Sequence, residues 1–338
     1  MKKKVNKLLI NKDKIKKFLK ENISYVLTII VIIILFNIKL PYYILAPGGT
    51  IDISDRIEYI EKEKNDGSLN MLYVTQYEAN VPTFLLSFIF RNWDLEDMEM
   101  SQISNETMDE IEIRNKIMLD NSINNAKYVA YNAAKKDITI SSQKNYIIGT
   151  LVSTNLKIGD EVLAINDTIV DDLPQIKNII TEHEIGDKLT FKIIRDKKEI
   201  TVDEEVKEIE GMKAIGVIFI TDYEYKLKPE IELKFKKSES GSSGGLMMAL
   251  SIYNAITDED ILKGRKIAGT GTIDNYGNVG EIGGIKYKIM GAARKGMDVV
   301  LVPSANYKEA LKTKKDNNYD LEIVEIKTFM DAINYLKG

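Results

Sequence analysis

Apolar residues follow two patterns along this chain. Runs of about four to eight apolar or β-branched residues, bounded by glycine, asparagine or aspartate, predict strands, whereas apolar residues roughly three or four positions apart predict helices. The predicted strands cover residues 71–75, 146–152, 186–195, 199–206, 216–220, 231–235, 267–273, 279–282 and 299–303, and the predicted helices cover 118–134, 173–183, 246–256 and 284–296. From residue 214 onwards strands and helices alternate, which is typical of an α/β domain.

The N-terminal region departs from both patterns. Residues 23–38, ISYVLTIIVIIILFNI, carry no charge, and apolar character resumes after Lys39. At about 1.5 Å per residue, a helix over 23–40 is just long enough to cross a hydrocarbon core of roughly 30 Å, with Lys39 snorkelling outward. We therefore predict a transmembrane helix there. A buried helix and a cleaved signal peptide are the alternatives, which the apolar character on every face and the length of the run disfavour.

Charge predicts the orientation of this helix. Nine lysines lie in the first twenty residues against the single acid Asp13. Because lysine-rich flanks stay on the cytoplasmic side, we predict a cytoplasmic segment over 1–22 and an extracellular location for everything after about residue 41. The expected localisation is the cell membrane, crossed once.

Amino-acid composition excludes several kinds of partner, nucleophile and metal site. The 338 residues are 44% hydrophobic, enough for about two domains with their own cores, and the net charge of −4 argues against nucleic acid as a partner. The absence of cysteine excludes thiol nucleophiles and zinc–cysteine sites, and the single histidine, His183, excludes a multi-histidine metal site. We expect no cofactor and no metal. A Ser-His-Asp triad has to use His183.

Residues 146–206 have the order strand, loop, helix and two strands. The segments IGDEVLAIND at 158–167 and GDKLTFKIIRD at 186–196 resemble those of a PDZ domain. PDZ domains bind an extended chain beside a strand and a helix, so the resemblance implies a peptide-docking module over 141–210. No Gly-Leu-Gly-Phe-type carboxylate loop precedes Ile147, so the resemblance does not extend to the loop that binds a free C-terminus.

The segment SGSSGG at 240–245 lies between a predicted strand and the apolar helix 246–256. Backbone N–H groups at a helix start are unpaired, and neighbouring glycines let a substrate carbonyl approach them, so this segment suits stabilisation of an oxyanion. A serine there needs a base. Lys286 and Lys288 are candidates because burial lowers the pKa of lysine, and helical spacing does not separate them. The spacing alone fits equally a serine N-cap and two solvated lysines.

The stretch SGSSGGLMMAL, followed by KGRKIAGTGTIDNYGNVGEIGGIKYKIMGAARKGMDVVLVP, resembles the proteolytic domain of the Lon family, the S16-type Ser-Lys peptidases. The resemblance implies that Ser243 is the nucleophile, that Lys288 is the general base and that Thr270 supports this lysine. We expect the oxyanion to be received at the backbone of Gly241, Ser242 and Gly244. Two positions depart from the family, since Ser242 stands where proline is usual and Gly244 where alanine is usual.

No Gly-x-x-x-x-Gly-Lys-Ser/Thr loop occurs in the chain, unlike in Lon proteins that carry an ATPase. One membrane span, LPYYILAPGG after it, a PDZ domain and a Lon-type domain together resemble the membrane-anchored, ATP-independent PDZ/Lon-like proteases of Gram-positive bacteria. The implied fold class is an α/β (α+β) Lon-type proteolytic domain over 211–338 with a PDZ domain. Residues 41–140 are expected to supply the first half of the Lon-like domain, with the PDZ module inserted.

The expected function is a serine endopeptidase that cleaves extracellular peptides or unfolded protein segments. A non-catalytic PDZ scaffold of the cell envelope with a degenerate Lon-like domain is the alternative, motivated by Ser242 and Gly244. A cytoplasmic-facing quality-control factor needs the opposite topology. Lon-type domains often form rings, so homo-oligomerisation stays open. The apolar segment VPTFLLSFIF at 81–90 suits either packing on the core or contact with a membrane surface.

Overall fold

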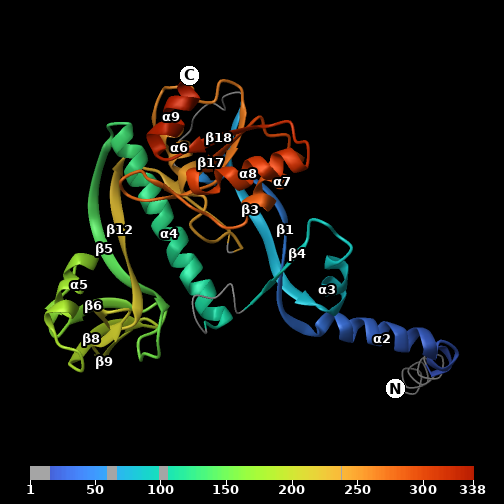
Figure 1. The fold of residues 1–338 in the computed structure, drawn as a ribbon, viewed down its shortest axis with the longest axis horizontal. Coiled ribbons are helices and arrows are strands. Elements are labelled where there is room, and N and C mark those ends of the chain that lie inside the picture. The colour runs from blue at the N-terminus through green and yellow to red at the C-terminus, as the bar shows by residue number, and fades with distance from the viewer. Residues whose placement is uncertain (1–15, 59–66, 99–105, 237) are drawn as a thin grey trace, which may run out of the picture. The chain divides into compact units, whose positions relative to one another are not determined.

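The computed structural model describes residues 16–58, 67–98, 106–236 and 238–338 (Figure 1). The chain divides into two compact units. The first comprises Met1–Ala46 and Thr75–Met98, and the second comprises Pro47–Val74 and Glu99–Gly338. Most of the predicted N-terminal lysine cluster lies outside the described residues.

The prediction of a transmembrane helix is wrong. Helix α2 spans Ile23–Asn37, only 15 residues. At about 1.5 Å per residue it is about 22 Å long, short of a hydrocarbon core of about 30 Å. Within the described ranges, no helix combines the length and the apolar character that crossing a membrane requires. This finding contradicts the predicted single-pass membrane location.

The end of α2 explains why hydropathy alone was misleading. Ile38 is already extended, with ψ of 107°, and strand β1 (Lys39–Asp52) begins at once. Pro41 reinforces the change, because a residue before proline avoids the helical conformation. Lys39 forms an ion pair with Glu78 instead of snorkelling.

The rest of the first unit is small. The beginning of β1 pairs antiparallel with β4 (Asp94–Asp97). Residues 81–90 contain the short helix α3 (Val81–Ser87), which Asn80 caps together with Thr83. The side chains of Phe88 and Ile89, just after α3, are exposed.

The second unit is built on parallel strands. Strand β14 (Lys266–Gly269) pairs with β3 (Ser68–Asn80) on one side and with β17 (Val299–Pro303) on the other, and β18 (Glu322–Ile326) follows β17. The order is β18-β17-β14-β3-β1. Strand β3 thus precedes and β14 follows the PDZ-like segment, so two stretches separated by almost two hundred residues build one sheet.

Helices cover both faces of this sheet. Along β17, Val299 and Leu301 join one apolar cluster while Val300 and Val302 join another, as the alternation of side chains in a strand requires. The first cluster contains residues of α4 (Met108–Ala133), α6 (Gly245–Ile256) and α9 (Phe329–Lys337), and the second contains residues of α7 (Ile285–Arg294) and α8 (Ser304–Asp316). The model is therefore a mixed α/β structure, as predicted.

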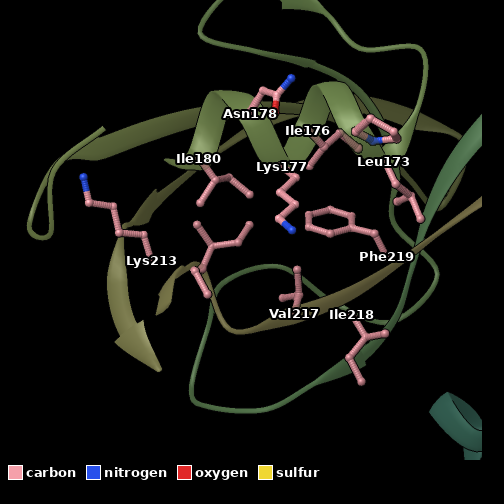
Figure 2. Close-up of a pocket in the computed structure, with 12 residues that line it drawn as sticks. Leu173, Ile176, Lys177, Asn178, Ile180, Lys213, Val217, Ile218 and Phe219 are labelled. Carbon is pink, nitrogen blue, oxygen red and sulfur yellow. The ribbon is translucent and has the colours of Figure 1, made fainter. Parts of the chain in front are cut away.

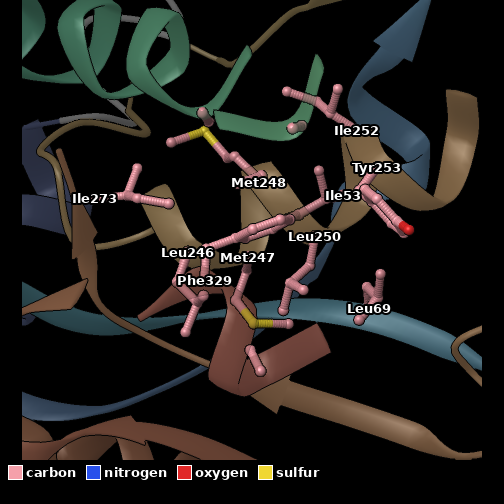
Figure 3. Close-up of a cluster of buried hydrophobic side chains, with 14 of the residues drawn as sticks. Ile53, Leu69, Leu246, Met247, Met248, Leu250, Ile252, Tyr253, Ile273 and Phe329 are labelled. Atoms are coloured by element: carbon pink, nitrogen blue, oxygen red, sulfur yellow. The ribbon is translucent and has the colours of Figure 1, made fainter. Parts of the chain in front are cut away.

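Helix α6 is the centre of the first cluster. Ten of its twelve residues are buried, and Figure 3 shows their side chains among Ile53, Leu69, Ile273 and Phe329. A helix that is apolar on every face is stable only when it is enclosed. The start of α6 is thereby fixed beneath the serine–glycine segment.

The PDZ-like part is an antiparallel sheet with the order β12-β5-β6-β8-β9. Two long strands, β5 (Asp137–Thr150) and β12 (Val217–Lys228), pair along their length. The chain enters the PDZ-like part through β5 and leaves it through β12. The other elements of this part are β6 (Glu161–Ile165), β7 (Thr168–Ile169), α5 (Leu173–Glu182), β8 (Lys188–Arg195), β9 (Lys198–Glu205), β10 (Lys207–Ile209) and β11 (Met212–Ala214).

Two predicted strand regions differ in detail. The hairpin over 267–282 is confined to β15 (Thr272–Ile273) and β16 (Val279–Gly280), because β14 pairs in parallel with β3 and β17 instead. The predicted strand 231–235 is reduced to β13 (Glu232–Leu233), which pairs with β2 (Ile57–Glu58). Both differences arise from partners distant in sequence.

Candidate active site

Ser243 lies immediately before Gly244, the N-cap of α6, and is half-buried. No side chain caps this helix end. The loop around Ser243 is instead held through its backbone carbonyls, by hydrogen bonds from α4, from the residues that follow β14 and from the first residue of α6.

The carbonyl of Ser243 accepts two hydrogen bonds. One comes from the N–H of Gly271 at 2.7 Å, and the other from Thr270 Oγ1 at 2.9 Å. Both donors directly follow β14, at the carboxyl end of a parallel strand, where ligand sites of open α/β sheets commonly lie. The carbonyl of Ser242 accepts from the N–H of Gly245 and from Ser122 Oγ of α4, each at 3.2 Å.

These bonds orient two consecutive peptide planes. In a trans peptide the C=O and the following N–H point in opposite directions. Clamping the carbonyls of Ser242 and Ser243 therefore turns the N–H groups of Ser243 and Gly244 away from the clamps. Among the residues that the structure describes, neither N–H has a hydrogen-bond partner. Both are available to a ligand atom.

The predicted backbone donors are arranged differently from one another. The N–H of Gly241 donates to the carbonyl of Asn115 at 3.2 Å and is therefore engaged. Ser242 contributes its carbonyl to the clamp described above, and Gly244 keeps an unengaged N–H. The sequence pattern does not single out the N–H of Ser243 itself, because only the clamped carbonyls of the fold reveal its direction.

Lys288 lies inside the protein on α7. Its side chain is 97% covered, with a relative exposure of 3%, and Nζ donates to Thr270 Oγ1 at 2.9 Å. Burial lowers the pKa of Lys288 from 10.5 to about 7, because the interior disfavours the ammonium form. The side chain is thus close to half neutral at pH 7.

The structure separates the two lysines that helical spacing left equivalent. The ammonium group of Lys286 lies 5.3 Å from the centre of the Tyr287 ring, and Lys286 is half-buried. Lys288 instead joins the side of α7 that faces the sheet. Only Lys288 reaches Thr270.

Thr270 links the lysine to the serine loop. Its side chain is fully buried. A threonine hydroxyl has one hydrogen to donate, and the carbonyl of Ser243 takes it, so the same oxygen receives the hydrogen bond from Lys288. The structure therefore brings together Ser243, Thr270 and Lys288, from three different segments.

Gly244 is explained by its neighbour in β3. A Cβ atom at position 244 would lie 1.9 Å from Met71 Sδ. Met71 is buried in the core cluster of α6, so its thioether occupies the space that an alanine methyl group would need. The absence of a side chain at this position therefore matches the local packing.

His183 is committed elsewhere. It is the C-cap of α5, with Nδ1 2.7 Å from the carbonyl of Ile179 and Nε2 3.4 Å from Asn166 Nδ2. Because both ring nitrogens contact neighbours within the PDZ-like part, the only histidine of the chain forms no triad with Ser243.

A groove of about 730 Å³ lies between α5 and the segment that leads into β12 (Figure 2). Its apolar lining includes Ile176, Ile180 and Phe219. Strand β12 is at the edge of its sheet, so its outer backbone can pair with an added strand. In Figure 2 the side chain of Lys177 points across the groove towards Phe219.

A turn at Gly216 lies at the end of this groove. Along the chain it comes after β5, β6, β8 and β9 and directly before β12. Ala214, Ile215 and Val217 line the groove around Gly216, whose φ of +79° favours glycine. No such loop precedes Ile147 in the sequence. A glycine turn instead precedes β12, which lies beside α5 and comes last among the strands of this sheet.

Comparisons with known proteins agree with these two parts. Residues 236–336 match the model of the Lon protease (S16) C-terminal proteolytic domain, and residues 147–206 match that of the PDZ domain. The chain is 32% identical over 96 residues to a Lon protease of Aster yellows witches'-broom phytoplasma and 34% identical over 95 residues to one of Roseiflexus castenholzii. Each match covers 28% of this chain and 12% of the relative, so the chain spans a small part of these proteins.

Among solved structures, the PDZ domain of an SdrC-like protein from Listeria monocytogenes is similar over 24% of this chain and 93% of that chain, at 16% identity and a TM-score of 0.23. The family matches support a Lon-like serine peptidase of the S16 family. They identify neither a Gram-positive source nor a membrane anchor.

Proposed function

We propose that this protein is a serine endopeptidase in which Ser243 is the nucleophile and Lys288 the general base. The observation that carries the proposal is the hydrogen-bonded connection from Lys288 Nζ through Thr270 Oγ1 to the backbone of Ser243, with Lys288 buried and without a carboxylate partner among the described residues. A buried lysine with a pKa of about 7 is available in its neutral form at physiological pH.

The reaction proceeds by acyl transfer. Neutral Lys288 takes the hydroxyl proton of Ser243 while the serine oxygen attacks the scissile carbonyl carbon. The resulting ammonium gives this proton to the leaving amine as the peptide C–N bond breaks. Water then attacks the acyl-enzyme, with Lys288 again as base, and the serine hydroxyl is regenerated.

The carbonyl oxygen of the substrate becomes negatively charged in each tetrahedral intermediate. The N–H groups of Ser243 and Gly244 have no partner among the described residues and lie at the start of α6, where the helix dipole favours negative charge. We assign oxyanion stabilisation to these two groups. Gly241, whose N–H is engaged, takes no direct part.

The expected substrates are peptides or unstructured protein segments. No nucleotide-binding loop occurs in the sequence, so the proposed activity is ATP-independent and does not include unfolding of stable proteins. The groove between α5 and β12 suits an extended chain added beside β12, and we propose that it delivers substrate segments to the enzyme.

The test is cleavage of unstructured peptides by the full chain, read by mass spectrometry. Wild type and Ser242→Ala should cleave, whereas Ser243→Ala and Lys288→Ala should not. Ser242→Ala is the matched control. It removes the hydroxyl beside Ser243 but keeps the backbone carbonyl of residue 242, which still accepts hydrogen bonds from Ser122 and Gly245. Cleavage that persists in Ser243→Ala refutes the assignment of the nucleophile. No cleavage by folded wild type favours the non-catalytic scaffold.

A further inference from the structure

Helix α4 contributes to the candidate active site from outside the family match. The match to the Lon-type domain begins at residue 236, whereas α4 spans Met108–Ala133. Three contacts join this helix to the site. The carbonyl of Asn115 accepts from Gly241, Ser122 Oγ donates to the carbonyl of Ser242, and Asn125 Nδ2 donates to the carbonyl of Ile273 at 3.2 Å.

These three residues lie on one side of the helix. Positions 115, 122 and 125 are separated by seven and three residues, which places them along one face at the helical period. The same face packs on α6, the helix that starts beside the nucleophile. The α4 contacts are therefore part of one continuous surface under the serine–glycine segment.

Ser122 is the member of this set that acts on the nucleophile peptide. Serines within helices commonly bond the carbonyl one turn earlier in their own helix. Ser122 is only 2% exposed, and its hydroxyl instead crosses to the loop and donates to the carbonyl of Ser242. Gly245 makes room for it, because a Cβ there would lie 2.8 Å from Ser122 Oγ.

The carbonyl of Ser242 belongs to the peptide whose N–H is that of Ser243. Because C=O and N–H are antiparallel in this plane, fixing the carbonyl fixes the direction of the proposed oxyanion donor. We propose that Ser122 is a positioning residue for the N–H of Ser243. The inference rests on the proposed function, and it adds a residue from the segment that precedes the PDZ-like part.

The strength of the contact sets the expected effect. Removal of an oxyanion donor lowers kcat by about 100- to 1,000-fold. Here the donor remains, and Gly245 still holds the carbonyl of Ser242. At 3.2 Å the hydrogen bond from Ser122 is also long for a hydroxyl donor. We therefore expect that its loss misaligns the oxyanion donor and lowers kcat by roughly tenfold.

The experiment compares Ser122→Ala with wild type in the full chain, using a peptide that wild type cleaves and Ser243→Ala does not. We expect kcat and kcat/KM to fall together by about tenfold, with KM within about twofold, as for an interaction that acts in the transition state. The midpoint of the pH–rate profile should not move, since the contacts of Lys288 are unchanged.

Ser251→Ala is the matched control. Ser251 is a serine of α6 with 5% exposure, and its buried Oγ has no hydrogen-bond partner within the described residues. Its loss should leave kcat unchanged. Ser122→Cys replaces the hydroxyl with a slightly larger thiol that is a weaker donor, and its kcat should fall between those of wild type and Ser122→Ala. It also serves if the alanine variant does not fold.

The outcomes are distinct. If wild type shows no cleavage that depends on Ser243, the proposed function itself fails. If wild type cleaves but Ser122→Ala has the kcat of wild type, or changes only KM, the positioning role is refuted and the proposed function stands. An equal fall in Ser251→Ala also refutes it, because the effect then reflects general loosening of the core.

Discussion

Replacement of Lys288 by methionine should stabilise the protein near neutral pH while it abolishes the proposed activity. Lys288 is 3% exposed, and burial lowers its pKa from 10.5 to about 7. At about 1.4 kcal/mol for each pH unit, this difference corresponds to roughly 5 kcal/mol of folding free energy. Methionine fills a similar volume without a charge, so it avoids this penalty.

The sign of the pH dependence follows from proton binding. Below pH 7 the lysine is charged in both folded and unfolded chains, and the full penalty applies. Between pH 7 and about 10.5 the unfolded chain binds a proton that the folded chain does not, so the free energy of unfolding of wild type rises with pH. The variant lacks this contribution. Its advantage should therefore be greatest below pH 7 and vanish near pH 10.5.

The expected advantage at pH 7 is about 3 kcal/mol. About 4 kcal/mol of the penalty applies there, because the folded lysine is half charged. The variant also loses the hydrogen bond from Lys288 to Thr270, worth about 1 kcal/mol. Urea unfolding followed by circular dichroism, from pH 6.5 to 9.5, measures the difference.

Lys286→Met is the control for loss of a lysine from α7, because Lys286 lies beside Tyr287 and does not contact Thr270. It should show no comparable gain. A Lys288→Met variant that is less stable than wild type at pH 7, or a difference between the two that stays constant with pH, would contradict our account of the buried lysine.

Three further predictions concern the same site and the groove. The cleavage rate should rise with pH through a midpoint near 7, as Lys288 loses its proton, and a rate that is flat from pH 6 to 8 contradicts the role of the lysine. Thr270→Val should lower kcat more than Thr270→Ser. Gly244→Ala should destabilise by about 1–3 kcal/mol through overpacking on Met71, and urea unfolding should show a smaller loss when Met71→Ala is already present; simple additivity would refute the contact. Lys177→Glu should weaken binding of acidic peptides to the groove, measured by fluorescence anisotropy, and spare basic ones, whereas an equal loss for both would show that charge is not selected there.

The packing of Gly244 against Met71 bears on the alternative of an inactive scaffold. That alternative was motivated by the departures at Ser242 and Gly244. The thioether of Met71 occupies the space of the missing methyl group, and Ser242 offers its carbonyl, not its hydroxyl, to the clamps from Ser122 and Gly245. Both departures are thus compatible with a working loop.

Hydropathy gave a wrong prediction at the N-terminus for a physical reason. The predicted helix over 23–40 is just long enough at about 1.5 Å per residue, but a span needs one continuous helix. Chain direction changes at Ile38, and the following residues pair as a strand with Asp94–Asp97. Pairing with a partner about fifty residues away is not encoded in the local pattern.

The sequence by itself determined what depends on near neighbours in the chain. It predicted the helices over 246–256 and 284–296, the strand over 299–303, the PDZ-like order and the position of the serine–glycine segment before a buried helix, because hydrophobic period and glycine turns act over a few residues. It did not predict α8, β18 or α9. The identity of Ser243, Thr270 and Lys288 as candidates came from resemblance to a family.

Only the tertiary structure decided how these candidates are arranged. Helical spacing could not distinguish Lys286 from Lys288, since burial depends on which side of α7 meets the sheet. The direction of the N–H of Ser243 depends on a hydroxyl more than a hundred residues away, in Ser122. Such contacts join segments through packing and backbone geometry, and no local pattern specifies them.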